Sequence, residues 1–301
     1  MLTAVLVPVL LVCALMVSKS RGGLGISVGT PVFEVYKVAD EEQEEPFRWG
    51  SDQPVFVLVV GSDARPGQTS PARGDALHLV GVNPATGQAT ILNIPRDTWI
   101  DVPDVGPDKI NVGHYYGGPV LQAKAVAHLV GVDVPFVVSV GFEGFESIVD
   151  EMGGVDVDVP FAMNDGNSGA RFEPGVNHML GGEALAFSRN RYLEGGDFTR
   201  SHHQSLVIIA ALAKLRGEGV SPANVRRWLS ILVRHGTYDG VSATDLYRLG
   251  RLALSVDPAH VRTVTMPGII GSTARQSVVF AAPEADGLFA DFRDDAVLQS
   301  H

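Results

Sequence analysis

Residues 55–63 read VFVLVVGSD, residues 76–83 read ALHLVGVN and residues 89–95 read ATILNIP. All three segments are short, rich in aliphatic residues, and bounded by glycine, proline or asparagine. Apolar runs of this length, flanked in this way, are typical of strands in a sheet that is covered on both faces. The segments therefore predict three strands of a buried sheet.

Strands and helices alternate along the rest of the chain. FVVSVG (136–141) and VDVDVP (155–160) predict further strands, and a short strand is expected at 32–38. Helical spacing occurs at 119–130, 144–152, 181–186, 201–217, 223–235 and 243–255. The interleaved order shows no internal repeat, so we predict a single domain of the α/β class over residues 54–301, a three-layer α-β-α arrangement with a mixed central sheet.

The N-terminus carries an apolar run, LTAVLVPVLLVCALMV (2–17), which is closed by polar and basic residues at 18–21. A full membrane span needs about 20 apolar residues, so this run is of marginal length. It lacks a small-residue cleavage site, which favours an uncleaved anchor over 1–21 rather than a signal peptide. The glycine-rich and acidic residues 22–53 then predict a juxtamembrane linker, and the protein is expected at the cell membrane with a single pass.

The composition excludes some classes of protein. The chain of 301 residues has 23 Lys and Arg against 34 Asp and Glu, a net charge of −11. Such an acidic balance argues against a nucleic-acid partner, because proteins that bind nucleic acid neutralise phosphates with a basic face. Cys13 is the one cysteine and lies in the apolar run, so the folded body has no disulfide and no thiolate metal site.

Three arginines are gathered in AFSRNRYLEGGDFTR (186–200). If AFSRNR is a strand, Arg189 and Arg191 share one face and Asn190 points the other way. Arg200 then lies at the start of a helix near residue 201, four residues before Gln204, and helix starts favour anions. The stretch predicts a site for a planar anion such as phosphate. The alternative is that the arginines make surface ion pairs and that Ser201 and Gln204 form a capping box.

Aspartate and arginine residues also stand together at three predicted strand ends. Carboxylates that meet phosphate and arginines suggest a hard divalent cation, most naturally Mg²⁺. The neighbouring pairs are Asp63 with Arg65, Arg73 with Asp75, and Arg96 with Asp97.

The order of these motifs resembles the LytR-CpsA-Psr family. The motifs are VLVVGSDAR (57–65), the run from ARGDALHLV to DTWIDVP (72–103), DKIN (108–111), YGGP (116–119), FEGFESIVDEMGGVDVDVP (142–160), LGGEALAFSRNR (180–191), GGDFTRSHHQ (195–204), MPG (266–268) and SVVFAAPEADGLFADFRDD (277–295). Gly74 stands where the family often has serine.

The resemblance implies a membrane-anchored, extracytoplasmic phosphotransferase. Such an enzyme moves a glycopolymer from a polyprenyl-pyrophosphate carrier onto peptidoglycan and leaves a phosphodiester link. It further implies Mg²⁺ at the metal ligands Asp63 and Asp75. The expected catalytic residues are Asp63, Asp75, Arg73, Arg96 and Asp97. The expected pyrophosphate-binding residues are Arg65, Arg73, Arg96, Arg189, Arg191, Arg200 and Gln204.

Other functions fit parts of the same pattern. A pyrophosphatase or phosphatase would act on the same lipid with water in place of the acceptor, and a lipid-binding protein without activity would need the arginines but not both aspartates. A membrane-bound regulator of the transcription-attenuator type is a third alternative. The net charge of −11 counts against direct binding of DNA.

Overall fold

A computed structural model gives the structure of the chain. It describes residues 33–38, 49, 53–63, 71–191, 195–219, 221, 223–224, 227–228, 231, 236–273 and 276–299. The predicted membrane anchor, most of the predicted linker, much of the helix expected at 223–235, and Arg65 lie outside these residues. Within the described part, none of the helices combines the length and the apolar character that a membrane span requires.

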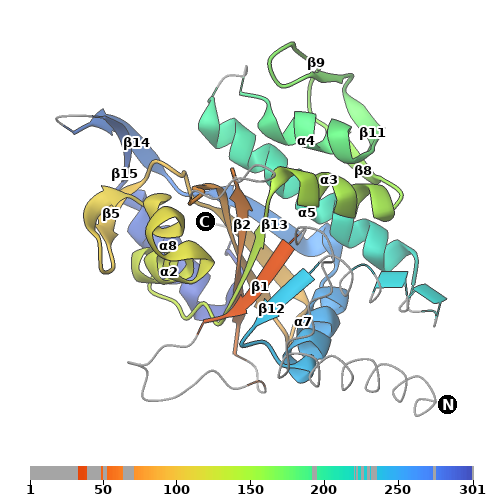
Figure 1. The fold of residues 1–301 in the computed structure, drawn as a ribbon, viewed down its shortest axis with the longest axis horizontal. Coiled ribbons are helices and arrows are strands. Elements are labelled where there is room, and N and C mark those ends of the chain that lie inside the picture. The colour runs from red at the N-terminus through yellow and green to blue at the C-terminus, as the bar shows by residue number, and fades with distance from the viewer. Residues whose placement is uncertain are drawn as a thin grey trace.

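A mixed sheet of seven strands forms the centre of the fold, as predicted (Figure 1). β2, β3 and β4 are antiparallel neighbours, whereas β7 runs parallel to β2 and β13 runs parallel to β4. The strands, in sheet order, are β12 (Gly236–Asp239), β1 (Phe33–Lys37), β7 (Phe136–Val140), β2 (Val55–Ser62), β3 (Gly74–Asn83), β4 (Gln88–Asn93) and β13 (Val261–Thr265).

The strand expected near the N-terminus is part of this central sheet. β1 pairs with β7 on one side and with β12 on the other, so the sheet includes residues that the sequence placed in the linker before residue 54. The acidic run at 39–46 suggested a linker, but β1 precedes that run and buries Phe33 and Val35. The folded domain therefore includes residues before 54.

Helices cover both faces of the sheet because its side chains alternate. Leu77 and Leu79 of β3 pack into the large core with α2 (Val112–Val130) and α8 (Glu284–Asp295). Val80 and Val82 point the other way, toward α5 (Asp197–Gly217) and α7 (Ala243–Ser255). Figure 1 shows α2 and α8 on one side of the sheet and α5 and α7 on the other. The α/β class and the covering of both faces agree with the sequence.

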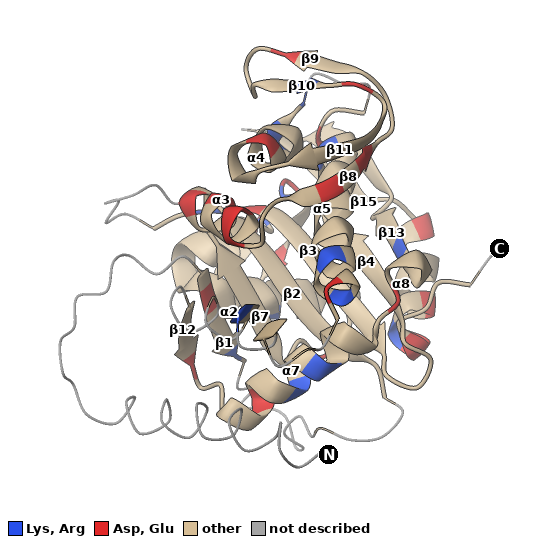
Figure 2. Cartoon of the chain, turned by 90° about the vertical axis from the view of Figure 1, so that its right-hand side faces the viewer, with Lys and Arg blue, Asp and Glu red and all other residues tan. Residues whose placement is uncertain are grey.

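A smaller lobe lies at one end of the sheet, at the opposite end from α7 (Figure 2). It is built from two helices and two antiparallel strand pairs that share a second apolar core with α5, in which Phe187 and Met179 are fully buried. Its elements are α3 (Phe142–Glu151), α4 (Gly181–Arg189), β8 (Val155–Val159) with β11 (Gly175–Met179), and β9 (Met163–Asp165) with β10 (Ala170–Phe172). Residues of this lobe and of the sheet together line a cavity.

Two further hairpins lie on the α2 side. β5 (Trp99–Val102) pairs with β6 (Gly106–Lys109), and β14 (Gly268–Ser272) pairs with β15 (Ser277–Ala281). Thr98 bridges to Val279, which joins the two hairpins. A 3₁₀ turn, η1 (Pro258–His260), precedes β13.

Candidate active site

Asp63 and Arg73 are held together where β2 and β3 pair. The backbone N–H of Asp63 donates to the carbonyl of Arg73 at 3.1 Å, and the N–H of Arg73 donates to Asp63 Oδ1 at 2.7 Å. Gly74 follows in a crowded position, since a Cβ there would lie 3.0 Å from the Gln122 side chain and 3.2 Å from Val60. The backbone thus fixes the Asp63 carboxylate at the sheet edge, beside Asp75.

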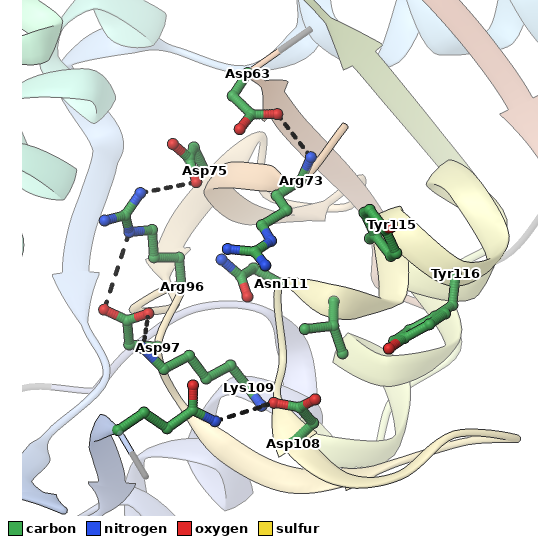
Figure 3. A pocket seen from close by; sticks show the side chains of 12 residues that line it. Asp63, Arg73, Asp75, Arg96, Asp97, Asp108, Lys109, Asn111, Tyr115 and Tyr116 are labelled. Carbon is green, nitrogen blue, oxygen red and sulfur yellow. Dashed lines mark hydrogen bonds and ion pairs between the residues drawn. The ribbon is translucent and has the colours of Figure 1, made fainter. Parts of the chain in front are cut away.

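Asp75 is bound to two arginines from distant parts of the chain. Its Oδ1 lies 2.8 Å from Nη1 of Arg96, and its backbone carbonyl accepts from Nη2 of Arg200 at 3.0 Å. Arg96 follows β4 and lies within a turn that Thr98 closes, because the N–H and Oγ1 of Thr98 both donate to the carbonyl of Pro95. Figure 3 shows the ion pairs that link Asp75, Arg96 and Asp97. Strand ends therefore bring Asp63, Asp75 and Arg96 together, as expected.

Arg96 and Arg200 have pKa values that are shifted in opposite directions. Burial lowers the pKa of Arg96, but the carboxylates of Asp75, Asp197 and Asp97 outweigh this effect and raise it. Burial lowers the pKa of Arg200 to about 10, partly opposed by the Asp197 carboxylate at 2.8 Å. Both side chains stay charged at neutral pH, which is what binding of an anion requires.

A cavity of about 820 Å³ lies between the sheet and the small lobe. Its polar lining residues are Asp63, Asp75, His78, Asp165, Asn167, Ser168, Ser188, Arg189, Arg191, Arg200 and Gln204. Its apolar lining residues are Val59, Ala76, Val140, Phe142, Phe145, Leu185 and Ile208. The lining therefore offers arginines for an anionic group together with apolar side chains for a hydrocarbon group.

Arg189 and Arg191 line this cavity, but they are not on a strand as the sequence analysis supposed. α4 continues through Arg189, because Ala184 and Phe187 are spaced three apart and are fully buried in the lobe. Asn190 ends the helix and is 1% exposed, so it does not point away into solvent. The Arg189 guanidinium carbon lies 5.3 Å from the centre of the Phe142 ring. No carboxylate within the described residues makes an ion pair with Arg189.

The alternative interpretation, a capping box of Ser201 and Gln204 at the start of α5, is wrong. The helix begins at Asp197, so Ser201 lies in its second turn and donates to the carbonyl of Asp197 at 3.0 Å. Gln204 reaches the end of α4 instead and donates to the carbonyl of Ser188 at 3.1 Å. Arg200 and Gln204 therefore both face the cavity from α5, as the anion-site interpretation requires.

A second cavity, of about 440 Å³, meets the first at Asp63 and Asp75, which line both. Arg73, Arg96 and Asp97 belong to this second cavity. The predicted pyrophosphate-binding residues are thus divided between two cavities that share the two aspartates. The residues that the sequence analysis did not assign to the site are Asp108, Lys109, Asn111, Val112, Tyr115, Tyr116 and Gln276. Most of these residues lie in the DKIN (108–111) and YGGP (116–119) motifs, which could have pointed to them.

The two aspartates could hold a divalent cation. One oxygen of each carboxylate is engaged, by Arg73 N–H for Asp63 and by Arg96 for Asp75, and within the described residues the other oxygen of each makes no hydrogen bond or ion pair. Mg²⁺ prefers one or two carboxylates completed by substrate oxygens and water. In the described part of the chain no three acidic, histidine or cysteine side chains form a metal cluster.

Fold and site together define an α/β protein with a cavity, lined by arginines, carboxylates and apolar side chains, at the strand ends of a mixed sheet. The chain belongs to the LytR_cpsA_psr family, whose sequence pattern matches residues 29–288. The resemblance to this family that the sequence motifs indicated is therefore confirmed.

Known relatives and solved structures agree with this assignment. A protein of Bacillus mycoides named polyisoprenyl-teichoic acid–peptidoglycan teichoic acid transferase TagU is 34% identical over 196 residues, which are 62% of this chain and 62% of that protein. The matched part thus spans less than two thirds of that relative. The B. subtilis TagU structure is 25% identical and has a TM-score of 0.63 over 83% of this chain and 99% of that chain. A TagT structure with bound octaprenyl pyrophosphate lipid shares the fold, at 22% identity and a TM-score of 0.64 over 91% and 99% of the two chains.

Proposed function

We propose that the protein is a phosphotransferase that moves a glycopolymer from a polyprenyl-pyrophosphate carrier onto peptidoglycan. The observation that carries the proposal is the cavity of about 820 Å³ whose lining combines three arginines and the carboxylates of Asp63 and Asp75 with apolar side chains. The pyrophosphate would lie at Arg189, Arg191 and Arg200, and the polyprenyl chain along the apolar side chains. The transferase names of the relatives support the same substrates.

The reaction needs positioning and charge neutralisation rather than a covalent intermediate. The oxygen of an acceptor hydroxyl forms a bond to the phosphorus that bears the sugar, while the bond from that phosphorus to the bridging oxygen breaks. Polyprenyl phosphate leaves and the hydroxyl proton passes to water. Arg200 and Arg96 hold Asp75 from two sides, so the charges at the junction of the cavities are fixed before the substrate binds.

Mg²⁺ is the proposed cofactor, held by Asp63 and Asp75. When bound, the ion would neutralise charge that develops on the phosphate oxygens. The same two carboxylates would otherwise repel a pyrophosphate, which is the physical reason to expect a cation between them. Arginine alone would suffice for a protein that only binds the lipid.

The proposed location is the outer side of the cell membrane, with residues 1–21 as a single-pass anchor. A polyprenyl carrier and a wall acceptor both require the folded domain to stay near the membrane surface. A reporter that is active only outside the cytoplasm, fused after His301, should be active. Activity of a cytoplasm-only reporter at this position would contradict the topology.

One experiment separates the proposed function from the hydrolase alternative. The full chain in detergent is incubated with a labelled lipid-pyrophosphate glycan and uncross-linked peptidoglycan, with MgCl₂ or with a chelator. We expect the label on peptidoglycan and an equal amount of polyprenyl monophosphate, with both products lost in the chelator. Label released as free glycan phosphate would indicate a hydrolase, and an unchanged lipid would contradict both reactions.

A further inference from the structure

The cavity of about 440 Å³ differs in its charge from the arginine cavity, although the two meet at Asp63 and Asp75. Its cations are largely paired: Arg96 lies 2.8 Å from Asp75, and Lys109 Nζ lies 2.9 Å from Asp97. Its lining contains four carboxylates, of Asp63, Asp75, Asp97 and Asp108, and three cations, of Arg73, Arg96 and Lys109. Such a lining is poorly suited to a second polyanion and well suited to hydroxyl and amide groups.

Two tyrosines form the outer wall of this cavity. Tyr115 is 41% exposed and Tyr116 is 61% exposed, and their rings meet edge to face with centres 5.1 Å apart. Tyrosine rings offer an apolar face with a polar tip, and they are enriched where proteins recognise partly apolar ligands. A pair of exposed rings beside paired charges and amides matches a sugar ring, which has apolar C–H faces and hydroxyl edges.

The fold holds these tyrosines in place. The first turn of α2 carries them and is separated from the rest of the helix by a kink at Gly117 and Gly118, where φ is +66° at Gly118. The fully buried side chain of Gln122 clamps this turn, because its Oε1 accepts from His114 N at 3.2 Å and its Nε2 donates to the carbonyl of Ile110 at 3.0 Å.

Two hairpins close the opposite wall. Asp108 and Lys109 come from β6, and Gln276 precedes β15. Gln276 Nε2 donates to Asp108 Oδ1 at 3.3 Å and so joins the two hairpins at the cavity. Figure 3 shows Asp108 and Lys109 across the cavity from Asp63 and Asp75, with the tyrosines along its side. The space between them is open toward the two aspartates.

We propose that this cavity binds the acceptor glycan strand, with Tyr115 and Tyr116 as a stacking surface and Gln276 and Asp108 as hydrogen-bonding groups. The inference rests on the proposed phosphotransferase function. It places the acceptor hydroxyl at Asp63 and Asp75 from the side opposite the lipid, so that donor and acceptor occupy separate cavities and meet at the aspartates.

The test is a pair of binding measurements on the full chain in detergent. Calorimetry is run with a soluble tetrasaccharide of alternating N-acetylglucosamine and N-acetylmuramic acid, and separately with a short-chain polyprenyl pyrophosphate. We expect Tyr116→Ala to weaken tetrasaccharide binding at least tenfold and to leave the lipid affinity unchanged. Tyr116→Phe should recover most of the loss, and Arg189→Ala should show the reverse pattern. Tyr247→Ala, on α7, is the control that should change neither affinity.

Tetrasaccharide affinity that is unchanged in Tyr116→Ala would overturn the inference, as would a wild-type protein that transfers glycan but does not bind the tetrasaccharide. Loss of tetrasaccharide binding in Tyr116→Ala without any transfer by the wild type would support the inference and count against the proposed function. Because Tyr116 is 61% exposed, melting curves should be the same for the wild type and the variants at this position.

Discussion

Arg200 Nη2 donates a 3.0 Å hydrogen bond to the backbone carbonyl of Asp75, 125 residues earlier in the chain. The same nitrogen lies 2.8 Å from the carboxylate of Asp197, and the arginine is 5% exposed. The first turn of α5 is therefore fastened to the start of β3 at the point where the two cavities meet. Arg200 therefore holds these two elements together in addition to any contact with an anion. Arg191 has no such structural role, because its side chain is 47% exposed.

We therefore predict that Arg200→Ala and Arg191→Ala have different consequences. Removing one partner of a buried ion pair typically costs about 3–5 kcal/mol, so Arg200→Ala should lower both the melting temperature and the lipid affinity. Arg191→Ala should lower the lipid affinity alone, because its ion pair with Asp197 at 3.7 Å is exposed. Melting curves and calorimetry with a polyprenyl pyrophosphate measure the two effects. Equal losses of stability in the two variants would contradict the structural role of Arg200.

Asp63→Asn and Asp75→Asn should each abolish transfer with the domain still folded. Asparagine keeps an oxygen that can accept from the N–H of Arg73, so at position 63 the substitution removes the charge and preserves the backbone contact. Asp63→Ala would also lose that hydrogen bond, at about 1 kcal/mol. Transfer assays across a range of Mg²⁺ concentrations, together with melting curves, provide the measurement. Full activity in either asparagine variant, or activity that is insensitive to a chelator, would remove the proposed metal role.

Arg189→Ala should weaken lipid binding tenfold or more, because a charge-assisted contact to phosphate is worth roughly 1.5–3 kcal/mol. Arg189→Lys should recover part of this loss, since a point charge cannot reproduce bidentate geometry. Arg171→Ala is the matched control, because Arg171 is exposed on β10 and does not line the cavity. A wild-type affinity in Arg189→Ala would contradict the placement of the pyrophosphate.

Asn190 shows where reasoning from the sequence fails. Because the residue is buried, Asn190→Ala cannot serve as a control that leaves the site unchanged. Alternation on a strand would have placed Asn190 away from the site, but the residue is buried at the end of α4. The helix extends to Arg189 because Ala184 and Phe187 fill the core of the small lobe, and the segment AFSRNR alone does not reveal that lobe. The two arginines still reach the cavity, Arg189 from the last residue of α4 and Arg191 from the residue after the helix cap.

The sheet and its aspartates were predictable for a local reason. β2, β3 and β4 are near-continuous apolar runs, and the antiparallel pairing of consecutive strands places the residue that follows β2 beside those that begin β3. Long-range partners were not predictable in this way. Gln276 meets Asp108 across 168 residues, and β1 pairs with β12 about 200 residues later. Such pairings depend on how the layers assemble, and no local pattern of side chains encodes them.

Two buried histidines, His78 in the sheet and His203 on α5, should contribute to the dependence of stability on pH. Burial lowers the pKa of His78 to about 4, although its hydrogen bond to Asn93, with Nδ1 2.7 Å from Oδ1, acts in the opposite direction. Burial and the neighbouring His202 lower the pKa of His203 to about 4. The ring of His203 stacks on Phe187, with centres 4.8 Å apart, and neither ring nitrogen has a hydrogen-bond partner in the described part of the chain.

The unfolded chain binds protons at these histidines below its ordinary pKa of 6.5, whereas the folded protein stays neutral down to about pH 4. The contribution of these histidines to stability is therefore full above pH 6.5 and should fall as the pH decreases from 6.5 to 4, by about 3 kcal/mol for His78 alone. His203→Phe should reduce this fall and raise stability at pH 5, because phenylalanine keeps the stacking and removes two buried nitrogens that lack partners. Urea unfolding at pH 7, 5.5 and 4.5 measures the dependence, with the exposed His260→Gln as a control that keeps the wild-type slope. If His203→Phe loses stability as steeply as the wild type over this range, His203 is protonated in the folded state and the argument from its burial is wrong.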